Sequence, residues 1–447
     1  MEWILSTLST LGIFAAALLI LVFIHELGHF LAAKLFGMRV ERFSLGFPPR
    51  IFGIQKGETD YCLGATPLGG YVKISGMIDE SMDDDYLDEE PKPWEFRSKP
   101  VWQRIVVITA GVIFNMILAV AIYGGLAFSN GETKVKLDSM EGIYVAEGSL
   151  PSKVGFQTGD KLVGVNGKDV PYFTDLFAPN EMMASSLSYT VIRSGQRMTI
   201  PVADSLISDI GKQEFITQNN VVPSVPITQI QPGEPADQAG MEVGDVITAI
   251  NGEQVNYLQE LISKISSSDD SLAITVNRGG DVKEFTIMPN EQNKLGIAFQ
   301  PDMSNFFEIE RFQYGLFESI SVGVDKTNAT LTGIIQGFNK MFSGDISVRE
   351  NLGGPVAIAN VTKQATDAGG FIGFWNITAF LSVTLAIMNI LPIPALDGGH
   401  LMFLIYEGVT RREPSAKVRM VLQQIGFILL LGLIIFVTFN DILRQFG

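Results

Sequence analysis

Four stretches of the sequence are long and apolar enough to cross a lipid bilayer. They contain no charged residue and span residues 3–24, 105–131, 368–396 and 420–440. A helix rises about 1.5 Å per residue, so about 20 apolar residues cross a hydrocarbon core of roughly 30 Å. The pattern therefore predicts an α-helical polytopic membrane protein with four transmembrane helices.

The residues that flank these stretches predict how the helices are oriented. The first stretch follows the acidic Glu2 and exceeds the apolar run of about 7–15 residues in a signal peptide, so we expect a retained helix. Short cytoplasmic loops are rich in Lys and Arg. Such residues follow the first stretch and precede the last one, at Lys34, Arg39, Arg42, Arg50, Arg411, Arg412, Lys417 and Arg419. We therefore expect both termini and residues 132–367 on the outer side.

The outer segment contains an internal repeat with an offset of 85 residues. Residues 159–167 recur as residues 244–252, and Arg193 and Arg278 keep the same offset. In each copy an alternating apolar run ends in Asn-Gly, which is typical of a tight hairpin turn. The repeat resembles bacterial PDZ domains, whose sheet edge binds an extended peptide and captures its terminal carboxylate. A pair of structural spacers is the alternative.

A second periodic pattern follows the repeat. Apolar residues fall at helical spacing on one face, at Leu331, Ile334, Ile335, Phe338, Met341 and Phe342. This spacing predicts an amphipathic helix. The helix either packs on the repeated domains or lies in the outer membrane interface, and we favour the interface.

Composition and charge exclude several classes of function. The net charge of −16 argues against binding to nucleic acid, whose partners are basic. The single cysteine, Cys62, excludes an intrachain disulfide and a cysteine-based zinc knuckle. The acidic run at residues 79–90 lacks the glycine that an EF-hand needs, so we interpret it as a solvated loop. Three histidines leave few candidate metal ligands.

Two of those histidines lie in one motif, His25-Glu26-Leu27-Gly28-His29, which continues from the first apolar stretch. Histidines four residues apart project from one helix face, so both imidazoles can hold one zinc ion. Glu26 lies beside them and can take a proton from water. Polar groups at membrane depth are costly and are usually functional. The motif therefore predicts a catalytic metal site.

A catalytic zinc normally takes a third protein ligand. Asp397 or His400 can supply it, because both follow the end of the third apolar stretch. The predicted orientation brings the ends of the first and third helices to the same inner depth. We favour Asp397, since Pro392 and Pro394 break the helix there and let the chain bend towards the metal. A cap for the Gly398-Gly399 turn is the alternative role of Asp397.

Taken together, these motifs resemble the site-2 protease family of intramembrane zinc metalloproteases. The resemblance rests on the His25–His29 motif, the Leu-Asp-Gly-Gly motif at Asp397 and the tandem PDZ-like repeat. Shorter matches lie at residues 67–73, 111–115 and 353–355. The resemblance implies that His25, His29 and Asp397 are the zinc ligands and that Glu26 is the general base. It leaves His400 outside the ligand set, and iron or cobalt could occupy the same site.

A protease that cuts inside the membrane needs a surface that holds its substrate in an unwound, extended form. The alternation at residues 61–74 favours an exposed strand edge, and its glycines permit close backbone approach. The resemblance implies a membrane-dipping β-hairpin that binds substrate at Gly69, Gly70 and Tyr71, whereas an ordinary cytoplasmic hairpin is the alternative. Asn389 lies beside the helix break. Its side chain either binds the substrate backbone or has a structural role as a cap at that break.

The sequence and the resemblance together predict peptide hydrolysis inside the bacterial inner membrane. The resemblance implies that the substrate is a single-pass membrane protein, such as an anti-sigma factor already trimmed outside. The PDZ pair on the periplasmic side would then act as a size filter or as a dock for the trimmed end. A non-enzymatic PDZ-bearing adaptor is the alternative; a metal transporter is weaker, because the membrane segments show no inverted repeat.

The expected divisions are a first helix at 1–36, a cytoplasmic loop with hairpin at 37–104, a second helix at 105–131, PDZ domains at 132–220 and 221–303, an amphipathic connection at 304–367, a third helix at 368–400, a cytoplasmic loop at 401–419 and a fourth helix at 420–447.

Overall fold

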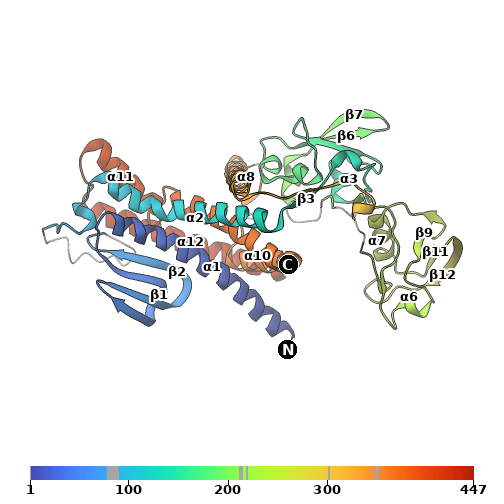
Figure 1. Ribbon diagram of the computed structural model, residues 1–447, viewed down its shortest axis with the longest axis horizontal. Coiled ribbons are helices and arrows are strands. Elements are labelled where there is room, and N and C mark those ends of the chain that lie inside the picture. Colours follow the sequence, from blue (N-terminus) through green and yellow to red (C-terminus); the bar gives the residue numbers. More distant parts are fainter. Residues whose placement is uncertain are drawn as a thin grey trace. The chain divides into compact units, whose positions relative to one another are not determined.

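The computed structural model describes residues 2–77, 90–210, 215–217, 220–300, 303–344, 346–348 and 352–446. The acidic run at 79–90 therefore lies outside the described residues up to residue 89. The chain divides into two compact units (Figure 1). Unit 1 comprises Met1–Gly131, Gln313–Ile334 and Val348–Gly447, and unit 2 comprises Glu132–Phe312 and Ile335–Ser347.

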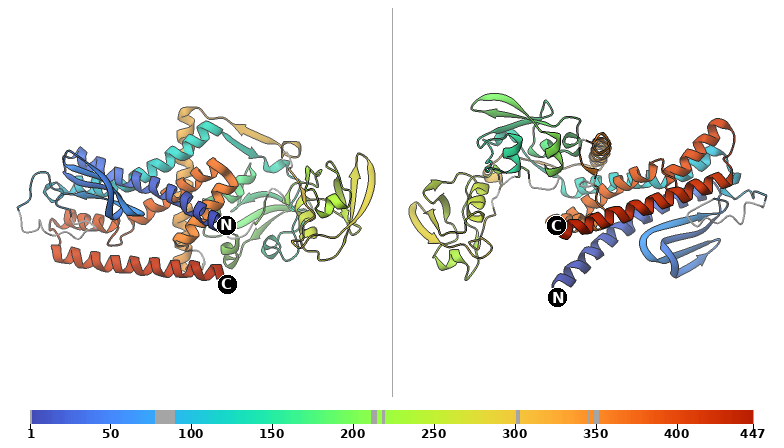
Figure 2. Two further views of the ribbon diagram at one scale, coloured as in Figure 1. Left: turned by 90° about the horizontal axis from the view of Figure 1, so that it is seen from below. Right: turned by 180° about the vertical axis from the view of Figure 1, so that it is seen from behind.

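Unit 1 is built on long apolar helices: α1 (Glu2–Leu35), α2 (Val101–Asn130), α10 (Pro355–Ile390) and α12 (Ala416–Phe446). Among the described residues, these four contain the segments that are long and apolar enough to cross a membrane. Those segments are Leu8–Leu35, Val101–Asn130, Pro355–Ile390 and Lys417–Asp441. The prediction of four helices that are long and apolar enough to span a membrane is thus confirmed. In the view from below, α12 (red) forms one edge of the unit (Figure 2).

The third helix differs from its predicted bounds at both ends. It begins at Pro355 rather than at residue 368, because the helix continues through polar residues that the apolar pattern does not include. A kink lies at Gly370, whose φ of 55° is outside the helical region. The helix ends at Ile390, before Pro392 and Pro394, and α11 (Asp397–Thr410) then begins at Asp397. The connection expected at 401–419 therefore includes most of a short helix.

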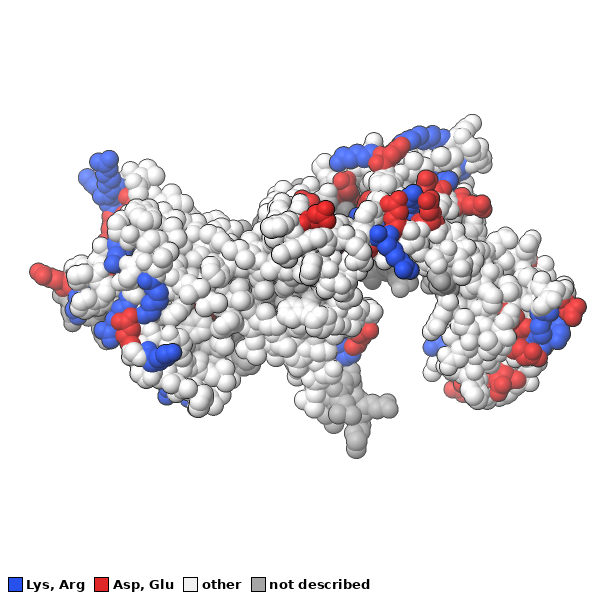
Figure 3. Space-filling model, in the orientation of Figure 1, with Lys and Arg blue, Asp and Glu red and all other residues white. Residues whose placement is uncertain are grey.

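On the face of unit 1 seen in Figure 3, Lys and Arg side chains gather at one end of the helices. On the face seen in Figure 3, the sides of the helices are nearly free of Lys, Arg, Asp and Glu. Blue side chains gather where the end of α11 and the sheet β1–β2 lie. An uncharged belt next to a basic end is the pattern expected of a bundle that crosses a membrane.

A small sheet lies beside α1 in unit 1 (Figure 1). It consists of β1 (Val40–Lys56) and β2 (Thr59–Ile74), which pair antiparallel with several register shifts. Residues 42–45 pair on one side with 60–63 and on the other with 70–73. The two long strands thus form four arms in the order 50–56, 59–64, 42–47 and 70–74. Within the described residues, the arm 70–74 is paired on one side only, which makes it an edge.

Unit 2 contains the two copies of the repeat as two sheets with the same strand order. The first sheet runs β5-β4-β6-β7 and the second runs β10-β9-β11-β12. Asn166 and Asn251 hold equivalent turns with the same positive φ of 51°, a conformation that asparagine tolerates. The strands are β4 (Lys161–Val165), β5 (Lys168–Asp169), β6 (Ser188–Arg193), β7 (Gln196–Pro201), β9 (Val246–Ile250), β10 (Glu253–Gln254), β11 (Leu272–Arg278) and β12 (Asp281–Ile287).

The same buried ion pair recurs in both copies. Arg193 donates to both carboxylate oxygens of Asp160 at 2.6 and 2.7 Å, and Arg278 does the same to Asp245 at 2.6 and 2.7 Å. Both aspartates are fully buried. Because paired charges on a planar fork tolerate burial better than single ones, the arginine spacing noted in the sequence has a structural cause.

Shorter elements complete unit 2. They are β3 (Glu132–Val135) paired with β14 (Ile309–Phe312), β8 (Gln229–Ile230) paired with β13 (Ile297–Ala298), α3 (Leu150–Val154), α4 (Pro179–Met182), α5 (Asp204–Ile210), α6 (Pro235–Gln238) and α7 (Leu258–Ser266). Single 3₁₀ turns lie at Phe96–Ser98 in unit 1 and at Leu137–Ser139, Phe173–Phe177 and Met303–Asn305 in unit 2.

The predicted amphipathic helix is present as the second half of α8 (Leu316–Ser343). Its Met341 packs against the apolar core of unit 2. Phe342, the next residue, is 87 % exposed. One residue of the apolar stripe is therefore covered by protein, and contact of the exposed ones with a membrane interface stays a prediction.

Candidate metal centre

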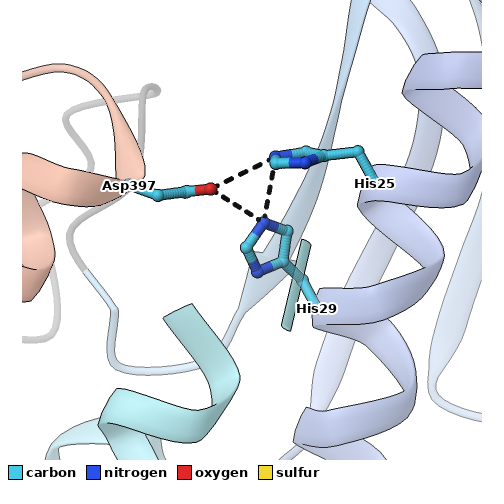
Figure 4. A group of neighbouring side chains, drawn as sticks. All are labelled: His25, His29 and Asp397. Atoms are coloured by element: carbon cyan, nitrogen blue, oxygen red, sulfur yellow. Dashed lines mark hydrogen bonds and ion pairs between the residues drawn. The ribbon is translucent and has the colours of Figure 1, made fainter. Parts of the chain in front are cut away.

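Three donor atoms from two distant parts of the chain converge in unit 1. His25 and His29 lie one turn apart on α1, and Asp397 reaches them from the start of α11 (Figure 4). The Nε2 atoms of the two histidines are 3.2 Å apart. Oδ2 of Asp397 lies 3.2 Å from Nε2 of His25 and 3.3 Å from Nε2 of His29. The sequence-predicted ligand set thus forms one compact triangle.

The chemistry of this triangle fits a zinc ion. Ligand atoms about 2.0–2.1 Å from one tetrahedral ion are roughly 3.3 Å apart, which is the spacing of the three donors. Two imidazole nitrogens and a carboxylate oxygen also suit a catalytic zinc, which keeps a fourth position open. Within the described part of the chain, the buried Oδ2 of Asp397 lies against the two imidazoles without a regular hydrogen bond. A buried carboxylate oxygen in that position is suited to a cation.

The break between α10 and α11 directs Asp397 towards the histidines. Ala395 has a positive φ of 85°, which turns the chain sharply before the new helix. A Cβ at Gly398 would lie 2.1 Å from the carbonyl oxygen of Leu391, so only glycine allows α11 to begin this close to the end of α10. Leu396 occupies the N-cap position of α11. The carboxylate of Asp397 therefore points into the triangle rather than capping the turn.

Close packing of α2 against α1 brings further groups to the outer sides of the histidines. A Cβ at Gly28 would lie 2.5 Å from the carbonyl oxygen of Ala110, so the two helix backbones nearly touch. Nδ1 of His29 lies 2.8 Å from the carbonyl oxygen of Val107. Nδ1 of His25 lies 3.3 Å from Nδ2 of Asn115.

A cavity of about 250 Å³ opens onto the metal triangle. The remaining predicted site residues all line it: Glu26, Gly69, Gly70, Tyr71 and Asn389. Glu26 is buried, and Nδ2 of Asn389 lies 3.3 Å from Nε2 of His25. The structure therefore brings every sequence-predicted site residue into one place.

His400, the alternative third ligand, lies on the next turn of α11. It lines the same cavity, but its Nε2 lies 3.4 Å from Nε2 of Gln423 on α12 rather than in the triangle. Among the described residues, the three-residue group that could hold a metal ion consists of His25, His29 and Asp397. The geometry thus favours Asp397 over His400, as expected from the sequence.

Two neighbours of the histidines were not singled out as site residues from the sequence. Asn115 is part of a short family match in the sequence, although an amide in the middle of an apolar span is itself a functional signal. The contact of Val107 is made by its backbone carbonyl, which leaves no trace in a side-chain pattern.

Residues 13–433 match the sequence model of Peptidase family M50, which is the site-2 protease family. The chain belongs to this family. Similar proteins include the regulator of sigma-E protease RseP of Escherichia coli, 30% identical over 98% of this chain and 100% of that protein. The regulator of sigma E protease of Haemophilus influenzae is 31% identical over 98% of this chain and 100% of that protein. A protein of Vibrio cholerae that is named as a zinc metalloprotease is 31% identical over 96% of this chain and 98% of that protein.

Membership of family M50 and the apolar helices identify the chain as a multi-pass membrane zinc metalloprotease. The alternatives of a non-enzymatic adaptor and of a metal transporter are therefore not retained. The fit of the donor triangle to zinc agrees with the family.

Proposed function

We propose that this M50 peptidase hydrolyses a peptide bond within, or at the edge of, the transmembrane segment of single-pass membrane proteins. In this proposal His25, His29 and Asp397 hold the zinc ion and Glu26 is the general base. The observation that carries it is the convergence of three donor atoms and a buried glutamate at the end of an apolar helix. A hydrolytic centre at that depth has little use except on a substrate that is also in the membrane.

The residues around the cavity divide the work of hydrolysis. When bound, the zinc ion supplies the Lewis acidity that activates the peptide carbonyl and the attacking water. Glu26 accepts a proton from that water and delivers it to the leaving amine. The amide of Asn389 lies next to His25, where it can donate a hydrogen bond to the substrate backbone.

The edge arm of the β1–β2 sheet is the proposed holder of the substrate. Gly69 and Gly70 line the cavity, and a Cβ at Gly70 would lie 3.2 Å from Cγ of Glu26. An unwound substrate segment can add to this edge as a further strand, with its backbone close to the general base. Tyr71 is held in place by Arg42, which donates to its hydroxyl at 3.1 Å, and by stacking on Phe47.

We extend the proposal to the position of this sheet in the bilayer. The outer arm 50–56 of the sheet exposes Ile51, Phe52 and Ile54, which are 66 %, 65 % and 61 % exposed. Three exposed apolar side chains on neighbouring positions are unfavourable in water. Their insertion into the lipid is the proposed membrane-dipping role of the hairpin.

Unit 2 is proposed to be a pair of PDZ domains. The equal strand orders of the two sheets support this assignment. In the second copy, a cavity of about 650 Å³ lies between α7 and the β8–β13 pair, lined by Leu261, Ile262 and the chain around Gly296. An apolar groove between a helix and a strand can take an extended peptide and its terminal carboxylate. The pair would thereby act as a size filter that admits trimmed substrates.

The names of the relatives support a narrower substrate class. Two of them carry the name regulator of sigma-E protease. We therefore propose as substrate an anti-sigma factor that has already been trimmed outside. The basic loops support a location in the bacterial inner membrane with both termini and the PDZ pair in the periplasm. The active site would then lie near the cytoplasmic side.

The deciding experiment compares the purified full-length chain with Glu26→Gln on a tagged single-pass membrane reporter. Zinc content is measured on the same samples. We expect the wild type to cut within the apolar segment, and Glu26→Gln to keep its zinc and cut nothing. Equal cleavage by both proteins would rule out Glu26 as the base. The size filter is tested separately by deleting residues 139–289, which should allow bulky, untrimmed substrates to be cut.

A further inference from the structure

Helix α2 presents a polar group to the outer nitrogen of each histidine. The carbonyl oxygen of Val107 lies 2.8 Å from Nδ1 of His29. A carbonyl oxygen can only accept a hydrogen bond, so the proton of His29 is on Nδ1. In the neutral imidazole, Nε2 then carries the lone pair on the side of Asp397. This is the tautomer that a metal ligand needs.

At His25 the corresponding neighbour is the amide of Asn115. Its Nδ2 lies 3.3 Å from Nδ1 of His25, whereas its Oδ1 is buried and has no hydrogen-bond partner among the described residues. The two ends of an amide have nearly the same size. Turning the amide by half a revolution exchanges them in place and brings Oδ1 to the Nδ1 proton of His25. That arrangement gives His25 the same tautomer as His29.

The position of Asn115 is otherwise hard to explain. The residue is fully buried in an apolar helix, where a polar amide is costly unless it is hydrogen-bonded. Its backbone oxygen accepts a hydrogen bond from Oγ of Ser382 at 2.7 Å, but this contact does not use the side chain. The imidazole of His25 is the partner that the structure offers to the amide.

We infer that Asn115 is a positioning residue of the metal centre: its Oδ1 accepts the Nδ1 proton of His25 and so directs the Nε2 lone pair of His25 at the zinc ion. This inference rests on the proposed ligand role of His25. Outer hydrogen bonds of this kind fix the orientation of a metal-bound imidazole and raise its basicity.

Zinc affinity of the full-length chain in detergent, measured by competition with a chelator and without substrate, tests the inference. Asn115→Leu removes both ends of the amide and should weaken zinc binding about 10–100-fold. Asn115→Asp keeps an acceptor oxygen and should bind zinc within a few-fold of the wild type. Ser382→Ala is the matched control, because it removes a buried hydrogen bond at the same helix contact without touching the histidine. It should bind zinc like the wild type.

Two results would overturn the inference. Unchanged zinc affinity in Asn115→Leu would show that His25 does not depend on the amide. Weak binding in a folded Asn115→Asp variant would show that the N–H end, not the oxygen, is the working group. The second result decides even where the leucine variant does not fold. Since no substrate is present, failure of Glu26 as the base would leave this outcome unaffected.

Discussion

Arg104 on α2 and Glu407 on α11 form a buried ion pair between residues 303 positions apart in the sequence. Arg104 is only 5 % exposed, and its guanidinium group also lies over the aromatic ring of Phe96. The pair fixes α11, which begins with Asp397, to the helix that contacts both histidines. The two halves of the proposed zinc site are therefore held to a common support.

Breaking this ion pair should destabilise the protein and loosen the zinc site. Arg104→Leu leaves Glu407 as a largely buried, unpaired carboxylate, which costs about 3–5 kcal/mol. Thermal unfolding of the zinc-loaded protein measures the loss. The exchange Arg104→Glu with Glu407→Arg should recover part of the stability, and a double variant no better than the single ones would contradict the importance of the pair.

Gly111 leaves the space that the imidazoles occupy. A Cβ at this position would lie 2.4 Å from Nε2 of His29 and 2.6 Å from Cε1 of His25. We therefore expect Gly111→Ala to abolish zinc binding, as measured by metal content after purification. Gly125→Ala on the same helix is the matched control, since a Cβ there has open space within 4 Å. Normal zinc content in Gly111→Ala would mean that the helices can separate without cost.

The exposed apolar residues of the β1–β2 sheet should matter only in a bilayer. Ile51→Asn with Phe52→Asn removes two mostly exposed side chains that do not line the cavity at the donor triangle. Cleavage of the membrane reporter in liposomes should fall about tenfold, while cleavage in detergent and zinc content should stay unchanged. Equal activity of this variant and the wild type in liposomes would argue against insertion of the hairpin into lipid.

Acid should weaken the second copy of the repeat through Asp245. Hydrogen bonding to Arg278 lowers the pKa of this carboxyl below its ordinary value of about 3.8. The pKa of Asp245 is thus lower in the folded state than in the unfolded state. The ion pair therefore stabilises the domain fully at pH values above the unfolded-state pKa, and this stabilisation is lost as the pH falls through the folded-state pKa.

Asp245→Asn should remove this acid dependence and cost about 1.5–3 kcal/mol at neutral pH, as for a hydrogen bond to a charged group. Limited proteolysis of the full chain across a pH series reports the opening of the domain. Asp281→Asn, at an exposed position in the same sheet, should behave like the wild type. Identical acid profiles for Asp245→Asn and the wild type would show that another group controls the transition.

Much of the fold and of the site could be predicted from the sequence, because the signals are local. Two histidines four residues apart must share a helix face, and uncharged runs of more than 20 residues have few other uses. The helix break before Asp397 follows from Pro392 and Pro394, which cannot continue a helix.

Other features could not be predicted, since they arise from contacts between distant segments. The beginning of α10 at Pro355 was missed because hydropathy does not register a helix that continues through Lys363 and Asp367. The double pairing of residues 42–45 depends on register shifts that no alternation pattern encodes. The ion pair of Arg104 with Glu407 and the backbone contact of Val107 exist only once the helices are packed.

The late position of the Leu-Asp-Gly-Gly motif in the chain determines when, during synthesis, the proposed zinc site can form. Synthesis runs from the N-terminus, so His25 and His29 leave the ribosome long before α11 does; Asn389, just ahead of it, follows His25 by 364 residues. A nascent chain that has not reached Asp397 carries only two of the three donors. With the proposed ligand set, the zinc site therefore cannot be completed until residue 397 of 447 has been translated and the chain has folded back onto its first helix.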